Sequence, residues 1–153
     1  MKKIIILLLF LSAGKFSFSQ KFGGDKKIDP DHWTFAVENS SADEATLVFK
    51  LKLDDNWHVY SQNTPEGGPL PMVYKFDATA CYELSGKCLE PKPHEEFDST
   101  FGVKVLIFDG EVTFRQKIKV KSKGCKIHGT IEYQICKDAC IFKDTTFDIE
   151  LKK

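Results

Sequence analysis

The chain has 153 residues, with 22 basic and 22 acidic side chains and five cysteines. Balanced charge provides no strongly basic surface of the kind that binds nucleic acid or an anionic membrane. An odd number of cysteines leaves at least one thiol unpaired or only transiently paired, and the spacings match no common zinc motif.

The first 19 residues are predicted to be a cleavable signal peptide. Two lysines precede an apolar run from Ile4 to Leu11, and small and polar residues follow it. The run is much shorter than the roughly 20 residues of a membrane-spanning helix, so no membrane insertion of the mature chain is expected. We therefore expect a periplasmic or secreted protein with a flexible leader over residues 20–30 and one domain over residues 31–153.

Two segments show the alternation of apolar and polar residues that is typical of half-buried β-strands. They are Ala45–Leu53 and Val112–Val120, and only Gln116 interrupts the inward apolar row of the second. Weaker candidates are Trp33–Val37, Trp57–Ser61, Met72–Phe76, Tyr82–Leu84, Val103–Phe108, Thr130–Cys136 and Thr145–Leu151. Turn-forming residues separate them, and no segment keeps a helical period. The pattern predicts an all-β fold, an immunoglobulin-like antiparallel β-sandwich.

The stretch Gln134–Lys143 places Cys136 and Cys140 four positions apart, after a predicted strand. If that strand ran straight on, the two Cα atoms would be about 13 Å apart, whereas a disulfide requires about 7 Å or less. The chain must therefore turn at residues 137–139 if the sulfurs are to meet, and Thr145–Leu151 supplies a returning strand. In the chain-entropy model so short a loop contributes only about 2 kcal/mol, which makes the bond a poor structural staple. Exposed bonds of this kind are typically those that exchange readily.

On spacing alone the pair has three possible roles: a passive hairpin disulfide, part of a metal site, or a redox pair. A metal site would need Cys125 and His128 as further ligands. A straight strand would separate those two residues from the pair by about 20 Å unless the sheet folds them together. Cys81 and Cys88 flank a Ser-Gly turn signal and could form a second disulfide; otherwise they are expected to pack as small hydrophobic residues.

A family resemblance is carried by three stretches, DNWHVYSQNTPEGGPLPMVYKF, YELSGKCLEPKPHEEFDSTFGVKVLIFDGEVTFRQKIKV and GTIEYQICKDAC. In this order, over roughly Trp33 to Leu151, the chain resembles the N-terminal periplasmic domain of the thiol:disulfide interchange protein DsbD. The resemblance implies a sandwich with a redox-active pair on a terminal hairpin, in which Cys140 forms the mixed disulfide and Cys136 resolves it. The implied partners are a thioredoxin-like redox protein or a membrane electron donor, and periplasmic disulfide-bearing proteins.

The resemblance also implies a cap over the pair, formed by a loop with an acidic-aromatic motif. HEEFD matches that motif, with Phe97 as the covering residue and Glu95 and Glu96 beside it, and Tyr60 matches an aromatic position that lines the site. Without the resemblance, this segment is an ordinary proline-stiffened connection with Phe97 in the core. His58 is expected to lie on the other face of its strand from Tyr60 and to share no site with it.

The chain departs from the family pattern at the hairpin. Its Cys-x3-Cys spacing is shorter than usual, and Phe142 and Lys143 stand where prolines commonly follow the second cysteine. The leading hypothesis is a thiol-disulfide exchange module, a possible protein-disulfide reductase component, that relays electrons through Cys136 and Cys140 by direct thiolate attack, without a cofactor or metal. The alternative is a non-catalytic immunoglobulin-like binding module with an inert hairpin disulfide.

Overall fold

The computed structural model describes residues 29–38, 43–122 and 124–151 of the chain. These residues form β-strands joined by turns and loops, and none of them belongs to a helix that could cross a membrane. The expected signal peptide and most of the expected leader lie outside the described residues. The strands are β1 (Asp31–Glu38), β2 (Glu44–Leu53), β3 (His58–Tyr60), β4 (Val73–Phe76), β5 (Tyr82–Leu84), β6 (His94–Asp98), β7 (Val103–Asp109), β8 (Glu111–Val120), β9 (Lys126–Cys136) and β10 (Cys140–Glu150).

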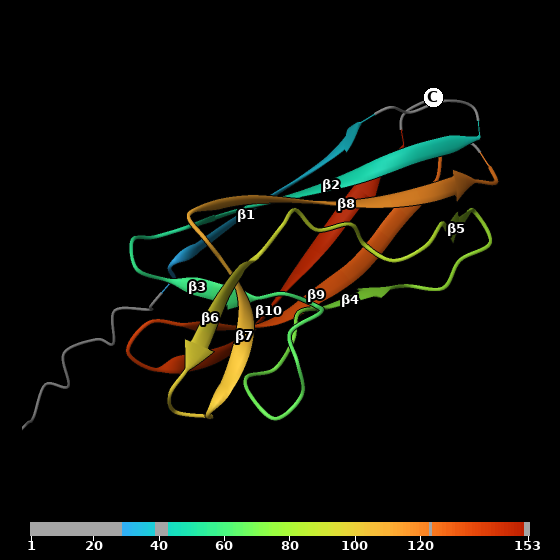
Figure 1. The fold of residues 1–153 in the computed structure, drawn as a ribbon. Coiled ribbons are helices and arrows are strands. Elements are labelled where there is room, and N and C mark those ends of the chain that lie inside the picture. Colours follow the sequence, from blue (N-terminus) through green and yellow to red (C-terminus); the bar gives the residue numbers. More distant parts are fainter. Residues whose placement is uncertain (1–28, 39–42, 123, 152–153) are drawn as a thin grey trace, which may run out of the picture.

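Two antiparallel sheets pack against each other to form the body of the molecule (Figure 1). The first sheet has the strand order β1-β2-β8-β5, and the second has the order β10-β9-β3-β7-β6 with β4 also paired to β9. Apolar side chains on the facing sides of the sheets make one continuous core. The prediction of an all-β, immunoglobulin-like antiparallel sandwich is confirmed.

Every predicted strand is present, several with their ends shifted by a few residues, but two features differ from the prediction. First, β9 and β10 are longer than expected, because they pair without interruption from Cys136 opposite Cys140 to Lys126 opposite Glu150. Second, the segment His94–Asp98 is a strand and not a loop, paired along its whole length with β7. Its side chains are largely exposed, so it lacks the apolar alternation by which a strand is recognised in sequence.

Gln116 interrupts the apolar row of β8, yet its side chain is buried with 1% of its surface exposed. Its Nε2 donates hydrogen bonds to the carbonyl oxygens of Gly86, at 3.1 Å, and Lys117, at 2.8 Å. A buried amide is tolerated when its polar atoms find partners. Gln116, the polar exception in this apolar row, therefore attaches the loop that follows β5 to strand β8.

A disulfide between Cys81 and Cys125 joins the start of β5 in the first sheet to the start of β9 in the second, with Cα atoms 5.5 Å apart. The hypothesis that Cys81 pairs with Cys88 is therefore wrong. The reason is topological: Tyr82 lies opposite Val120, and further along β8 Leu89 bridges to Arg115. The chain continues along β8 instead of folding back, so the residues that flank the Ser-Gly sequence do not meet.

Candidate redox site at the β9–β10 hairpin

The second disulfide joins Cys136, the last residue of β9, to Cys140, the first residue of β10. The two residues are directly opposite each other in the register, and their Cα atoms are 4.1 Å apart. The turn consists of residues 137–139, with the Lys137 amide donating to the Ala139 carbonyl at 3.3 Å. The predicted turn is thus confirmed, and β10 is the predicted returning strand.

The two cysteines differ sharply in exposure. Cys136 is buried, with 2% of its surface exposed, whereas Cys140 is exposed. Cys136 packs in a small cluster with Tyr60, Val105 and Ile107, separate from the main core. An incoming sulfur can therefore reach Cys140, while Cys136 is covered by the protein.

Strand β3 brings His58 and Tyr60 to the site. His58 is directly opposite Cys136 in the antiparallel pairing of β3 with β9. Its Nε2 lies 3.1 Å from the Tyr60 hydroxyl, and the two rings meet edge to face. The expectation that His58 faces away from Tyr60 is wrong, because residues two apart in a strand share a face. That periodicity is the sequence signal that could have found His58.

Burial and nearby carboxylates set the protonation states of this pair. Burial lowers the pKa of His58 below its ordinary value of 6.5, against the opposing effects of Glu96, Asp98 and Asp109. Burial, together with Asp98 and Glu96, raises the pKa of Tyr60 to about 12. At neutral pH the imidazole is therefore mostly neutral and the phenol keeps its proton.

The predicted cap residues lie on β6, at the edge of the second sheet. Glu96 is opposite Val105, which packs against Cys136, so Glu96 shares the face of the disulfide. Phe97 is opposite Lys104 and Glu95 forms an ion pair with Lys104, so both belong to the other face of the β6–β7 ribbon. Phe97 is 68% exposed, which rules out the alternative of a core residue.

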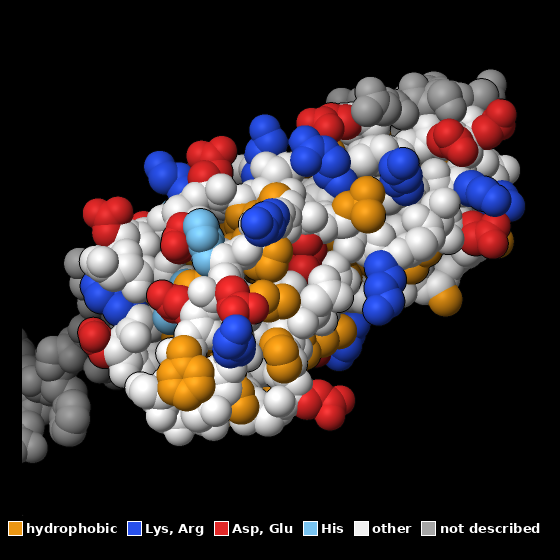
Figure 2. Space-filling model, in the orientation of Figure 1, with side chains coloured by type: hydrophobic (Ala, Val, Ile, Leu, Met, Phe, Trp, Pro, Cys, Tyr) orange, Lys and Arg blue, Asp and Glu red, His pale blue; other side chains and the backbone are white. Residues whose placement is uncertain are grey.

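The structure therefore brings together Cys136, Cys140, Tyr60 and Glu96 from the predicted set, and it adds His58. It does not bring Phe97 or Glu95 onto the same face. On the side of the molecule shown in Figure 2, hydrophobic side chains form separate small patches among interspersed acidic and basic groups.

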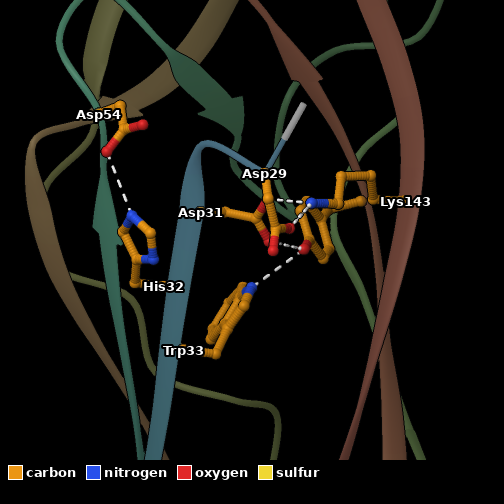
Figure 3. Close-up of polar contacts among 7 residues, drawn as sticks. Asp29, Asp31, His32, Trp33, Asp54 and Lys143 are labelled. Atoms are coloured by element: carbon orange, nitrogen blue, oxygen red, sulfur yellow. Dashed lines mark hydrogen bonds and ion pairs between the residues drawn. The ribbon is translucent and has the colours of Figure 1, made fainter. Parts of the chain in front are cut away.

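Lys143, three residues beyond Cys140, belongs to a cluster that links β10 to the start of β1 (Figure 3). Its Nζ contacts Asp29 at 2.9 Å and also contacts Asp31, to which the Tyr133 hydroxyl donates. Burial lowers the pKa of Lys143, but the hydrogen bonds and charges of the two aspartates outweigh it and the net shift is upward. The cation is thus neutralised by carboxylates and is a poor source of thiolate stabilisation.

The hypothesis of a metal site is wrong, because the side chains that would bind the metal are engaged with other partners. Cys125 is bonded to Cys81, the hairpin cysteines are bonded to each other, and His128 contacts Asp148. Among the described residues no group of three or more His, Cys, Asp or Glu side chains could hold a metal ion. The remaining thiol, Cys88, is buried, and burial raises its pKa to about 12, which makes it unreactive.

Comparisons with known proteins agree with the geometry of the hairpin site. The family model described as thiol:disulfide interchange protein DsbD, N-terminal, matches residues 25–152. The structure of the N-terminal periplasmic domain of ScsB from Proteus mirabilis is similar with a TM-score of 0.62 and 20% identity, covering 80% of this chain and 47% of that one. This chain thus spans about half of the ScsB chain that it matches.

Two structures from Neisseria meningitidis are also similar. The DsbD N-terminal domain in its reduced form has a TM-score of 0.53 and 22% identity, covering 81% of this chain and 85% of that one. The complex between the DsbD N-terminal and PilB N-terminal domains has a TM-score of 0.54 and 18% identity, covering 77% and 80%. At these identities the structures establish a common fold. The comparison with curated proteins found no match.

Proposed function

Because the chain belongs to the family of the N-terminal domain of the thiol:disulfide interchange protein DsbD, we propose that it is a periplasmic thiol-disulfide exchange module. It relays electrons between a thioredoxin-like protein and disulfide-bearing periplasmic proteins through Cys136 and Cys140. The observation that carries the proposal is the pairing of one exposed and one buried cysteine across the mouth of a single hairpin.

The exposure difference supports an order of events. When the oxidised domain is recharged, a donor thiolate attacks Cys140, the Cys136 sulfur leaves, and a mixed disulfide forms. The donor's second thiolate then attacks its own sulfur in that bond and leaves with a new disulfide, so that two electrons pass to the domain. In the forward reaction Cys140 attacks a client disulfide, and Cys136 then attacks Cys140 and releases the reduced client.

A protein is a more suitable partner than a small thiol. Phe142, two residues after Cys140 on the same face of β10, is 59% exposed, and Leu70 is 55% exposed. The Leu70 amide donates at 2.8 Å to the side chain of Gln134, the residue opposite Phe142 in the register. Apolar side chains next to a reactive sulfur provide contact area for a docked protein. The complex of a Neisseria meningitidis DsbD N-terminal domain with a PilB domain supports the same class of partner.

Phe97, Glu95 and Glu96 are proposed to form a cap that limits access to the disulfide. Support comes from the position of β6 as an edge strand and from the large exposed ring of Phe97. Because Phe97 lies on the other face of the ribbon in this arrangement, capping requires β6 to twist or shift. If the cap exists, Phe97→Ala should speed reduction of the hairpin disulfide by a small thiol such as dithiothreitol. An unchanged rate would remove Phe97 from the proposal.

Trapping of mixed disulfides tests the exchange function. Reduced Cys136→Ala should accumulate a covalent complex with a thioredoxin-fold protein whose resolving cysteine has been replaced and whose remaining cysteine is activated as a mixed disulfide with 5-thio-2-nitrobenzoate. Cys140 attacks the partner sulfur of that disulfide, thionitrobenzoate leaves, and no second thiol is present to resolve the new bond. Cys140→Ala should form none. Cys88→Ala is the matched control, since it removes the buried thiol and leaves the hairpin intact.

The redox potential separates exchange from the alternative of an inert binding module. A hairpin disulfide with a potential below about −300 mV would be a structural bond, whereas exchange requires a value nearer those of the known exchange proteins. Exchange is ruled out if the Cys136→Ala and Cys140→Ala variants both behave like the unmodified chain.

A further inference from the structure

The exchange steps proposed above require the buried thiol of Cys136 to lose its proton, and neither cysteine can accept it. When Cys136 resolves a mixed disulfide it must attack as a thiolate. With 2% of its surface exposed, it lies in a cluster of Tyr60, Val105 and Ile107, and burial in such surroundings favours the neutral thiol. On β10, Lys143 is neutralised by two aspartates, and in the turn Lys137, next to Cys136, is exposed to solvent and is followed by Asp138. A proton acceptor inside the site would therefore speed the step.

His58 occupies the position that such an acceptor needs. It is directly opposite Cys136 in the antiparallel pairing of β3 with β9. Directly opposed residues on one face have Cβ atoms about 4.5–5.5 Å apart, which is within reach of a thiol and an imidazole ring. The packing of Cys136 against Tyr60, which shares the face of His58, confirms that the side chains lie on the same side of the sheet.

We propose that His58 accepts the proton of the Cys136 thiol as that cysteine resolves the mixed disulfide. The inference rests on the exchange function proposed above and deepens it by assigning a proton-accepting residue. The proton moves from Cys136 Sγ to the imidazole, and the thiolate attacks Cys140 Sγ. The Cys136–Cys140 bond forms, the bond to the client breaks, and the departing client thiolate takes up a proton.

The surroundings of His58 suit this role. When Nε2–H donates to the Tyr60 oxygen, 3.1 Å away, the lone pair of Nδ1 is free to accept a proton. Tyr60 keeps its own proton at neutral pH because its pKa is raised to about 12. Three carboxylates favour the imidazolium once it forms: Glu96 and Asp98 on β6, and Asp109, which is opposite His58 on β7.

The test uses 2,2′-dithiodipyridine as a client, with the reduced domain in a Cys88→Ala background. Attack by Cys140 releases one pyridine-2-thione, and resolution by Cys136 releases a second, so absorbance separates the two steps in time. His58→Gln should slow the second release by about 10²-fold at neutral pH, the scale of general base catalysis, and leave the first release unchanged. His128→Gln is the matched control, because that ring pairs with Asp148 away from the hairpin cysteines.

A pH profile distinguishes proton transfer from a structural effect. The second release in the unmodified chain should level off above the lowered pKa of His58, whereas in His58→Gln it should keep rising toward the pKa of the Cys136 thiol. The rates should converge at high pH, where no acceptor is needed. His58→Asn provides a second variant if glutamine disturbs folding, which thermal unfolding would reveal.

The outcomes separate the two proposals. If the unmodified chain gives no second release, the exchange function itself fails. If it gives both releases and the two His58 variants match it at every pH, then exchange stands and the assignment of His58 is overturned.

Discussion

The two disulfides connect very different parts of the chain. Cys81 and Cys125 are separated by 44 residues and join the two sheets, with Cys125 buried at 2% exposure. Cys136 and Cys140 are separated by four residues and close a hairpin that backbone pairing already forms. In the chain-entropy model the long loop contributes about 4 kcal/mol and the short one about 2 kcal/mol.

Under the proposed function, this one small domain carries one bond for stability and another for exchange. The inter-sheet bond constrains distant parts of the unfolded chain, whereas the hairpin bond adds little to what β9 and β10 already fix. A bond that contributes little to stability can open and close without unfolding the domain. Its location at an exposed strand end makes it accessible to a partner sulfur.

The largest expected effect is a difference in reduction rate. Under native conditions dithiothreitol should reduce the hairpin bond at least about tenfold faster than the inter-sheet bond, because attack requires an accessible sulfur and Cys140 is exposed. Alkylation followed by mass spectrometry at successive times measures both rates in one sample. Equal rates would break the distinction between the two bonds.

Next in size is the loss of stability when each bond is removed. Replacing Cys81 and Cys125 by serine should lower the free energy of unfolding by about 4 kcal/mol, and replacing Cys136 and Cys140 by about 2 kcal/mol. Urea unfolding measures both values. A larger loss from the hairpin variant would show that its bond is structural after all.

The Lys143 cluster offers a third comparison, because it anchors the same strand that carries Cys140. Lys143→Met should cost about 3 kcal/mol, since it leaves the buried carboxylate of Asp31 without its cation; Asp31 has a side chain only 5% exposed. Lys75→Met, which breaks an ion pair on a lysine that is 58% exposed, is the control and should cost less than about 1 kcal/mol. If Lys143→Met costs no more than Lys75→Met, the Lys143 cluster adds little to the backbone pairing that already holds β10.

The smallest effect is a pH dependence of the free energy of unfolding that comes from His58. Because the pKa of His58 is lowered in the folded domain, the unfolded chain binds more protons between that value and 6.5. The stabilising contribution of neutral His58 is complete above the unfolded value and is lost as pH falls through the folded one. Urea unfolding from pH 7 to pH 5 should show a loss of stability that His58→Gln reduces. An unchanged slope would mean that other groups dominate.

The sequence predicts the strands that bury an apolar row, because apolar and polar residues alternate in β2, β8, β9 and the end of β10. Strand β6 leaves no such trace: it is held by backbone pairing to β7 while its side chains remain largely exposed. The Cys81–Cys125 bond is equally invisible, since it depends on how the two sheets pack.

The hairpin pair could be predicted, because four residues fix where the chain must turn. The role proposed for His58 requires knowledge of register, because the pairing of β3 with β9 sets it opposite Cys136. The face that it shares with Tyr60 was available from strand periodicity. Lys143 shows the opposite case. Its proximity in sequence to Cys140 suggests thiolate stabilisation, whereas its actual neighbours are Asp29, just before β1, and Asp31, the first residue of β1.

The anchor at Lys143 has a consequence for how the oxidation state can be sensed. Because β10 is tied to β1 only three residues beyond Cys140, breaking the sulfur bond frees the turn and the first residues of the strand, but not the sandwich behind them. The oxidised and reduced forms should therefore present nearly the same surface everywhere except at the tip. Any protein that discriminates between them must do so within a few residues of the sulfurs.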